Sequence, residues 1–578
     1  MPLQVKQYQQ FSAGENKLVS QAHVRDNESP NLWNIEYTED GLPSKRRGSK
    51  LIGSSGIGRI MGKASLYLAN GTKKFLRLKG TALQVLGAHW TDIAGKTFTD
   101  GLQTNFSQCR NALYIYNGTD TMGKYDGTTL SSLANAVIAK FGIYYNGMHI
   151  VSGNSTFPSR LYLSSTENSE DFTFLSGTAT AGGATTLTDS GQTWVVNAYQ
   201  NLSITIVKGT GKDQTRTIES NTATEITVSS AWTTNPDNTS KYTIGAGNTL
   251  DINKDDGQKI VGLGKFEEAL IVFKERAAYR VVFDSTGNPV VKMVNGCTGC
   301  ASHRSIESVE NDLFYLDPNG RIRTFGYVPN IPNVIRTNVL SSKIDPSISN
   351  INHTYKENSA AIYHDNKYIL AYPFGASTTN NRMAVFHLLY GSWAEWGDIE
   401  VNCFNQFIDT DNKEKLYFGS DNTGETYEFL VDGLYRDGDN AISAFWYSKQ
   451  FDFGSFSFKK QFMFADLQIR ALTGTLGINL ILDGTSTAKS TSLTSTFTSK
   501  DGLRVFMFRE AMFRQDAGSI ASVIATDDVR RIKVIKQART IQLKIYNDTI
   551  DESFTFMGLA LGAIPISPYS FDSSKVIY

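Results

Sequence analysis

The chain has 578 residues and balances 56 lysines and arginines against 56 aspartates and glutamates, so its formal net charge is zero. Hydrophobic residues make up 40% of the sequence and charged residues only 19%, which excludes a disordered polyelectrolyte. Zero net charge also argues against general attraction to nucleic acid or to an anionic membrane surface, so any DNA contact has to be local. The length is typical of about two to four domains.

Cysteine content and apolar runs bear on the cellular compartment. The four cysteines, Cys109, Cys297, Cys300 and Cys403, are too few for a disulfide framework, which indicates synthesis in a reducing compartment. The N-terminal residues include no apolar stretch typical of a signal peptide. The longest strongly apolar run, 556–566, is about half of the roughly 20 residues that a membrane-spanning helix needs. We therefore expect neither secretion nor a membrane span.

Short strands are predicted from the first third of the chain onward. Alternating aromatic and β-branched residues recur, for example at 113–116, 161–163, 270–273 and 416–418, whereas helical periodicity is scarce. Turn dipeptides such as those at 117–118 and 146–147 separate these runs. The pattern predicts an all-β protein built from many short hairpins.

One hairpin design repeats along the chain: an aromatic-rich strand, a polar turn, and a second strand that ends in Tyr or Phe before a glycine. Its copies begin near Ala64, Asn111, Tyr144, Phe266, Glu310, Ala360 and Asn412. If about 75 residues between the third and fourth copies are an insertion, the spacing is close to the roughly 40 to 50 residues of a propeller blade. We predict a β-propeller-like core of six or seven blades. An ordinary β-meander without radial closure is the alternative.

The presumed insertion, residues 176–245, is rich in Thr and Ser and predicts a small β-barrel or β-sandwich. Its expected core residues are Trp194, Ile204, Ile206, Ile218, Ile226, Val228 and Trp232. Insertions of this size are tolerated where their two ends meet at a loop tip. We therefore expect it in a loop that connects two blades.

Longer strands replace the hairpins beyond about residue 440 and predict a C-terminal β-sandwich. The predicted organisation is thus an N-terminal segment, 1–60, that closes or docks onto the core, and a propeller-like platform, 61–175 and 246–440. The inserted module, 176–245, interrupts the platform. The sandwich, 441–565, and a tail, 566–578, follow it.

Catalytic and metal-binding patterns are weak. Cys297 and Cys300 form a Cys-x-x-Cys pair, but structural zinc needs four ligands and the nearest other candidate is His303, so a packed or exposed thiol pair is favoured over metal or redox use. No nucleophile elbow, phosphate loop or dinucleotide fingerprint occurs on a strand-to-helix turn. We predict a non-enzymatic protein without a cofactor. Stretches 189–194 and 420–427 come near a turn of sialidase-like propellers, so a carbohydrate-binding or glycan-cleaving propeller is the alternative.

The densest basic stretch contains Lys45, Arg46, Arg47 and Lys50. On a neutral chain it is the best candidate for a patch that contacts DNA phosphates or a neighbouring protein. A solvated loop is the other interpretation.

The framework of the chain resembles the tail nozzle or tail hub proteins of short-tailed bacteriophages, which include the tail tubular protein B group. The stretches that carry the resemblance are 31–36 (NLWNIE), 40–48 (DGLPSKRRG), 171–174 (DFTF), 260–273 (IVGLGKFEEALIVF), 296–301 (GCTGCA), 390–396 (YGSWAEW) and 568–571 (PYSF). These patterns are spread over most of the chain and include no catalytic motif. The insertion departs from the family pattern.

The resemblance implies a structural protein of the virion tail, synthesised in the bacterial cytoplasm. Such a protein forms a hexameric ring on the tail axis below the adaptor and portal proteins, with tail fibres or spikes nearby. Its lumen extends and gates the channel through which double-stranded DNA leaves the capsid. A neutral chain suits a conduit for DNA, because each lysine or arginine that contacts phosphate adds affinity that retards passage.

Overall fold

The computed structural model describes residues 2–566, apart from 54–57, 134–136, 167, 174, 246–247, 285–287, 296–297, 328–334, 410, 485 and 495–527. Nearly all of its regular structure consists of β-strands in antiparallel sheets, which confirms the all-β prediction. The short helical segments are η1 (His303–Ser305), η2 (Ser341–Ile344), α1 (Asp345–Ile348) and η3 (Lys356–Asn358). No helix in the described ranges is long and apolar enough to cross a membrane.

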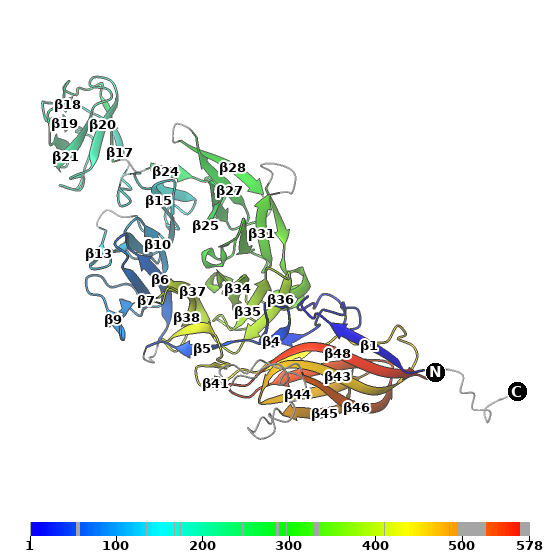
Figure 1. The fold of residues 1–578 in the computed structure, drawn as a ribbon. Helices are drawn as coiled ribbons and strands as arrows, with labels where there is room; N and C mark the ends of the chain where they lie inside the picture. The colour runs from blue at the N-terminus through cyan, green and yellow to red at the C-terminus, as the bar shows by residue number, and fades with distance from the viewer. Residues whose placement is uncertain are drawn as a thin grey trace, which may run out of the picture.

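Seven antiparallel sheets in the described part of the chain follow one another as blades (Figure 1). The first three are β6 (Ile60–Tyr67), β7 (Lys73–Lys79), β8 (Ala82–Leu86) and β9 (Trp90–Asp92); β10 (Asn105–Cys109), β11 (Ala112–Tyr116), β12 (Gly123–Tyr125) and β13 (Leu130–Ser132); and β14 (Phe141–Tyr145), β15 (Met148–Ser152), β16 (Arg160–Leu163) and β24 (Asn248–Asp251). The next three are β25 (Ile260–Phe266), β26 (Ala269–Lys274), β27 (Ala278–Phe283) and β28 (Pro289–Asn295); β29 (Glu307–Val309), β30 (Asp312–Leu316), β31 (Ile322–Tyr327) and β32 (Ile335–Val339); and β33 (Ala360–His364), β34 (Lys367–Tyr372), β35 (Arg382–His387) and β36 (Ser392–Gly397). The seventh is β37 (Val401–Ile408), β38 (Glu414–Ser420), β39 (Thr426–Val431) and β5 (Gly48–Leu51), which β40 (Arg436–Asp437) and β41 (Asn440–Ala441) extend.

The blades close into a ring. The first strand of each blade contacts the first strand of the next, in the order β6, β10, β14, β25, β29, β33 and β37, and β37 contacts β6 again. The core is therefore a seven-bladed β-propeller, with the first strands around its axis. Its last blade is completed by β5 from the N-terminal segment, which pairs with β39 through Leu51 and Tyr427. This pairing removes a free sheet edge and joins the ends of the ring non-covalently.

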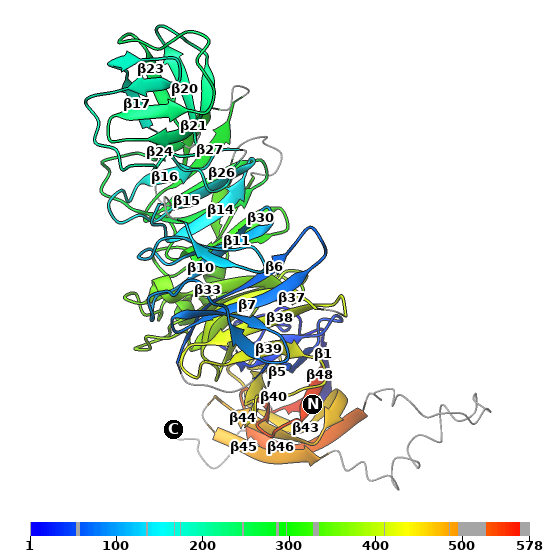
Figure 2. The ribbon, with the colours of Figure 1, turned by 90° about the vertical axis from the view of Figure 1, so that its left-hand side faces the viewer.

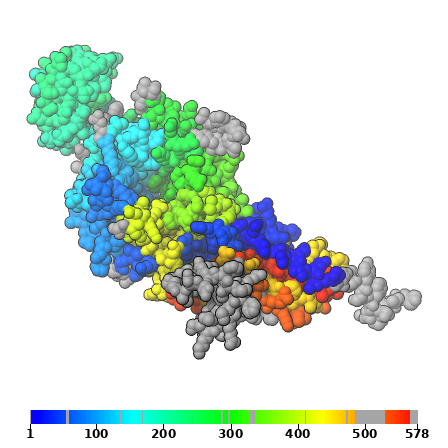
Figure 3. Space-filling model, viewed as in Figure 1, coloured from blue at the N-terminus to red at the C-terminus, as the bar shows by residue number. Residues whose placement is uncertain are grey.

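The inserted module has the strands β17 (Leu175–Thr178), β18 (Ala181–Gly182), β19 (Thr186–Thr188), β20 (Ser203–Lys208), β21 (Thr215–Asn221), β22 (Glu225–Val228) and β23 (Lys241–Ile244). All seven residues expected in its core lie in one buried cluster. It does not sit in a loop between blades, as expected, but between β16 and β24, the third and fourth strands of the third blade. That position is possible because Leu175 pairs with Ile244, so the chain enters and leaves the module at one point. Figure 3 shows the module as a separate lobe.

The C-terminal unit is a two-sheet sandwich that lies on the opposite side of the propeller from the inserted module (Figures 1 and 2). One sheet has the order β3-β4-β48-β43-β46, with β1 also paired to β48, and the other has the order β2-β42-β47-β44-β45. The strands from the N-terminal segment are β1 (Gln4–Gln9), β2 (Leu32–Trp33), β3 (Ile35–Tyr37) and β4 (Pro43–Lys45). The others are β42 (Ala444–Tyr447), β43 (Lys460–Thr473), β44 (Thr475–Leu482), β45 (Ser486–Thr494), β46 (Asp528–Ala538), β47 (Ile541–Asn547) and β48 (Ser553–Pro565).

The sandwich and the propeller share one hydrophobic core. A single buried cluster contains Ile369 and Phe418 of the propeller, Ile478 and Phe556 of the sandwich, and Trp396 between them. Trp396 is fully buried, and its indole N–H donates to the carbonyl of Ile35 at 2.6 Å. Because a large apolar surface is buried across this contact, we treat the propeller and the sandwich as one body, which we call the platform, and their contact as the joint.

Candidate functional site

The structure places Lys45 and Arg46 of the basic stretch inside the protein. Lys45 is fully buried, and its Nζ donates to Asn547 Oδ1 at 2.6 Å and to the carbonyl of Thr549 at 2.8 Å. Burial lowers the pKa of Lys45 to about 8. This lysine therefore fastens β4 to the turn after β47 of the sandwich.

Arg46 is also fully buried, at the joint. Its guanidinium forms a bidentate pair with Asp437, with N–O distances of 2.5 Å and 3.1 Å, and its Nε donates to Asn34 Oδ1 at 2.9 Å. Arg47 pairs with Glu36, Asp432 and Asp365, although part of its side chain is exposed.

Lys50 is the most exposed of the four basic residues. Burial thus argues against the prediction that Lys45 and Arg46 contact DNA phosphates or a neighbouring protein, and for Arg47 and Lys50 it stays a prediction. The side chains of Lys45 and Arg46 donate hydrogen bonds to groups from distant parts of the sequence. Because both are buried, a phosphate group cannot reach them. Arg46 is a structural element of the joint, and Lys45 is a structural element of the sandwich.

The thiols give no sign of a metal or redox centre in the residues that the structure describes. Cys109, Cys300 and Cys403 are buried and free, and Cys297 lies outside the described residues. Burial raises the pKa of Cys300 to about 12, so it stays a protonated, packed thiol at neutral pH. No cluster of three or more potential metal ligands occurs within the described ranges.

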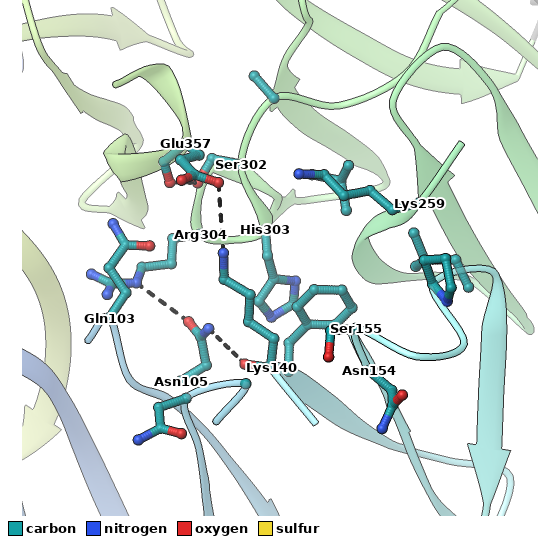
Figure 4. Close-up of a pocket in the computed structure, with 18 residues that line it drawn as sticks. Gln103, Asn105, Lys140, Asn154, Ser155, Lys259, Ser302, His303, Arg304 and Glu357 are labelled. Atoms are coloured by element: carbon teal, nitrogen blue, oxygen red, sulfur yellow. Dashed lines mark hydrogen bonds and ion pairs between the residues drawn. The ribbon is translucent and has the colours of Figure 1, made fainter. Parts of the chain in front are cut away.

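A cavity of about 460 Å³ lies at one end of the propeller axis and is the best candidate site (Figure 4). Part of its lining comes from loops that enter the first strands of neighbouring blades: Asn105 begins β10, Lys140 precedes β14, and Lys259 precedes β25. Arg304 in η1 and Glu357 in η3 occupy the corresponding loops before β29 and β33. The loops between β11 and β12 and between β15 and β16 also contribute. We call this cavity the mouth.

Arg304 crosses the propeller axis at the floor of the mouth. From the fifth blade its guanidinium donates to the carbonyl of Met61 in the first blade at 3.0 Å and to the carbonyl of Asn402 in the seventh at 2.8 Å. Its Nε donates to Asn105 Oδ1 in the second blade at 3.3 Å. Burial lowers the pKa of Arg304 to about 10, so it is still charged at neutral pH. One side chain thus ties four blades together and closes the axis at this end.

His303 beside it is neutral. Its ring stacks on Phe141, with centroids 4.7 Å apart, and its Nδ1 accepts the backbone N–H of Leu263 at 3.4 Å. Burial, and then the positive charges of Arg304 and Lys140, lower the pKa of His303 to about 3. The neutral ring therefore carries its proton on Nε2.

Sequence reasoning did not single out Lys140, Lys259, Arg304 or Glu357. Their positions could have identified them, because each lies one to three residues before the first strand of a blade. Repeats aligned on those first strands, rather than on the hairpins, would have placed these charged residues in equivalent loops. His303 was noted only as a neighbour of the Cys-x-x-Cys pair.

No protein-family model and no curated protein sequence matches the chain. Among solved structures, the computationally designed Ika8 protein aligns over 66% of this chain and 99% of its own, with 9% identity and a TM-score of 0.33. YCF48 bound to D1 peptide aligns over 70% and 98%, with 9% identity and a TM-score of 0.34. PorZ of Porphyromonas gingivalis, a surface component of the type-IX secretion system, aligns over 77% and 46%, with 10% identity and a TM-score of 0.33.

Proposed function

We propose that the chain is a structural tail nozzle, or tail hub, of a short-tailed bacteriophage, located in the virion tail. In this role it forms a ring, hexameric by resemblance, on the tail axis below the adaptor and portal proteins and beside tail fibres or spikes. The ring extends and gates the channel for genome ejection. No enzymatic step belongs to this role.

The observation that carries the proposal is where the resembling stretches lie. Residues 31–36, 40–48 and 390–396, which are far apart in the sequence, all meet at the joint. Trp396 donates to Ile35, and Arg46 donates to Asn34. These three stretches thus build a rigid connection, which suits a protein whose task is to hold its shape under load.

Asn34 illustrates how fully this connection is specified. Its Nδ2 donates to Asp398 and to the carbonyl of Ser443, both at 2.8 Å, while its Oδ1 accepts from Arg46 and from the N–H of Gly397 at 3.0 Å. All four hydrogen-bonding sites of the amide are used. Its backbone has a φ of 52°, a left-handed conformation that asparagine tolerates better than most residues.

A buried charge cluster fastens the N-terminal segment to the sixth blade. Lys17 Nζ lies 3.0 Å from Glu15 and 2.7 Å from Glu395, and both carboxylates are almost completely buried. Burial and the neighbouring Glu395 raise the pKa of Glu15 to about 8. The N-terminal segment therefore contacts propeller and sandwich alike and resists displacement from either.

Within this proposal, the side chain of Arg304 bears on where DNA would pass. Arg304 of the fifth blade bonds directly to the first, second and seventh blades, so no opening wide enough for duplex DNA separates these blades at its level. The genome would therefore pass through the lumen between protomers and not through the propeller of any one of them.

Electron microscopy of the purified chain and of the virion tests the proposal. We expect rings in the purified sample and density for the platform around the tail axis of the particle. A chain that stays monomeric at high concentration, together with virions that lack its density on the axis, would refute the role. Cleavage of host surface glycans by the chain would instead support a glycan-cleaving propeller.

A further inference from the structure

The mouth differs from the rest of this neutral protein in its charge. The charged side chains that line it are Lys140, Lys259, Arg304 and Glu357, which together carry a net charge of about +2 at neutral pH. His303 adds no charge because its pKa is near 3. The field inside the mouth is therefore positive, although the chain as a whole carries none.

The amides of the mouth are already committed to the protein. Asn105 accepts from Arg304 and donates to the carbonyl of Lys140 at 2.9 Å, and Asn154 donates to the carbonyl of Ile138 at 3.0 Å. Gln103 donates to Asn358 at 2.8 Å, and the Ser302 hydroxyl donates to the carbonyls of Glu357 and Ser359. These groups shape the wall of the cavity but offer little to a ligand.

The polar groups of the mouth that can still form hydrogen bonds with a ligand are mainly donors. Lys140 forms an ion pair with Glu357 at 3.6 Å and Lys259 forms one with Glu275 at 3.8 Å, but these distances are too long for hydrogen bonds, so the ammonium N–H groups can still donate to a ligand. Arg304 has five N–H groups, and three of its hydrogen bonds go to the protein. His303 presents Nε2–H. A ligand that binds these N–H donors has to supply hydrogen-bond acceptors. A negatively charged ligand is also attracted by the positive charge of the mouth.

The remaining wall is apolar. Phe141, Pro158, Ile260 and Val261 line the mouth beside the cations. A cavity of about 460 Å³ is within the range of small-molecule sites and is far larger than an inorganic anion needs. An occupant that fills it therefore carries its acceptors on a compact organic body.

We propose that the mouth binds a small organic carboxylate, with the carboxylate held by Lys140, Lys259 and the free N–H groups of Arg304 and its carbon body against Phe141 and Ile260. A sugar acid and a short dicarboxylic acid share this chemistry. The inference does not depend on the proposed tail role, because it rests only on the geometry of the mouth within one chain.

Isothermal titration of the full chain at low ionic strength tests the inference with four probes: glucuronate, glutarate, glucose and inorganic phosphate. We expect at least one of the two acids to bind, more tightly than glucose and phosphate do, and added salt to weaken binding because it screens these half-exposed lysines. The acid that binds more tightly identifies the source of the carboxylate. The inference would be overturned if glucose bound as tightly as glucuronate, or if phosphate bound as tightly as either acid. It would also be overturned if neither acid bound.

Charge variants test the inference in both directions, because some should weaken acid binding and one should tighten it. Lys140→Gln and Lys259→Gln should each weaken acid binding by about three- to tenfold, because each removes a charged donor. Glu357→Gln should tighten it, because the carboxylate that competes for Lys140 is lost. Lys212→Gln, which removes an exposed lysine of the inserted module that pairs only loosely with Asp213, is the matched control and should change nothing. Equal affinities in all four folded variants would contradict the site.

Discussion

Arg46 and Asp437 form a buried bidentate pair between residues that are 391 positions apart in the sequence. Arg46 lies between the strands that the N-terminal segment contributes to the sandwich and to the last blade, and Asp437 lies in the β40 extension of that blade. The same aspartate accepts the hydroxyl of Ser49 at 2.9 Å. One carboxylate therefore holds both the joint and the strand that closes the propeller.

Removal of this carboxylate charge should destabilise the platform strongly. Asp437→Asn leaves the Arg46 guanidinium buried without its counter-charge, and we expect the free energy of unfolding to fall by about 3 to 5 kcal/mol. Chemical denaturation followed by tryptophan fluorescence measures the change, since Trp396 and Trp446 lie in the shared core.

The exposed pair of Lys449 and Asp26 is the control for that measurement. Asp26 is largely exposed, so Asp26→Asn should change the unfolding free energy by less than about 1 kcal/mol. Similar losses in the two variants would mean that Asp437 has no special role at the joint.

Arg304 should govern the closure of the propeller ring. Arg304→Met keeps most of the side-chain volume but leaves Met61, Asn105 and Asn402 without their donor, and we expect a loss of roughly 2 to 4 kcal/mol. Hydrogen exchange should accelerate in β6, β10 and β37, the strands that hold the acceptors.

Arg160→Met is the comparison for Arg304, because Arg160 pairs with Asp251 near the surface of the third blade. It should leave exchange in β6, β10 and β37 unchanged. Unaltered protection of these strands in Arg304→Met would show that the arginine does not tie the blades together.

The repeat architecture could be predicted from the sequence because blade hairpins are local. Each of the seven hairpin copies, from Ala64 to Asn412, falls in a different blade. The alternation of apolar and polar residues and the turn dipeptides each involve only a few neighbouring residues. They can therefore be recognised without knowledge of the tertiary structure. The module core could be predicted for the same reason.

The joint and the mouth depend on long-range contacts that no local pattern encodes. A run of Lys and Arg is typical of a solvated surface, and nothing near Arg46 in sequence shows that Asp437 will neutralise it. The position of the inserted module was missed for a related reason, since only the pairing of β16 with β24 shows that the blade continues after it.

Glu307 should make stability depend on pH. It begins β29, and burial raises its pKa to about 8, with no ion pair or side-chain hydrogen bond among the described residues. The unfolded value is about 4.3, so the folded state holds this proton more tightly. The contribution of Glu307 to the free energy of unfolding is complete below the unfolded pKa and is lost as the pH rises through about 8. The free energy of unfolding therefore falls by at most about 1.4 kcal/mol per pH unit because of this group.

Glu307→Gln should remove that slope. Unfolding free energies measured from pH 5 to pH 9, a window set by these two pKa values, should converge at the acid end and favour the variant at the alkaline end. The comparison isolates Glu307 from His149, whose pKa burial lowers to about 4 and whose contribution is instead lost as the pH falls. Parallel profiles for the two proteins would rule out a titrating Glu307.

The inserted module should be removable without loss of the propeller. A Cβ placed on Gly245 would lie 2.0 Å from the carbonyl oxygen of Thr173, so the two ends of the module nearly touch. Deletion of residues 175–244 with a short glycine linker keeps Phe172 in its buried cluster and leaves β16 free to pair with β24. Because no blade strand is lost, we expect calorimetry to show the platform transition at an unchanged temperature. Deletion of residues 248–252, which comprise β24 and Ile252, is the control, since it removes Leu250 and Ile252 from the core between the third and fourth blades and should lower that temperature. A platform that fails to fold without the module would mean that the module takes part in forming the third blade.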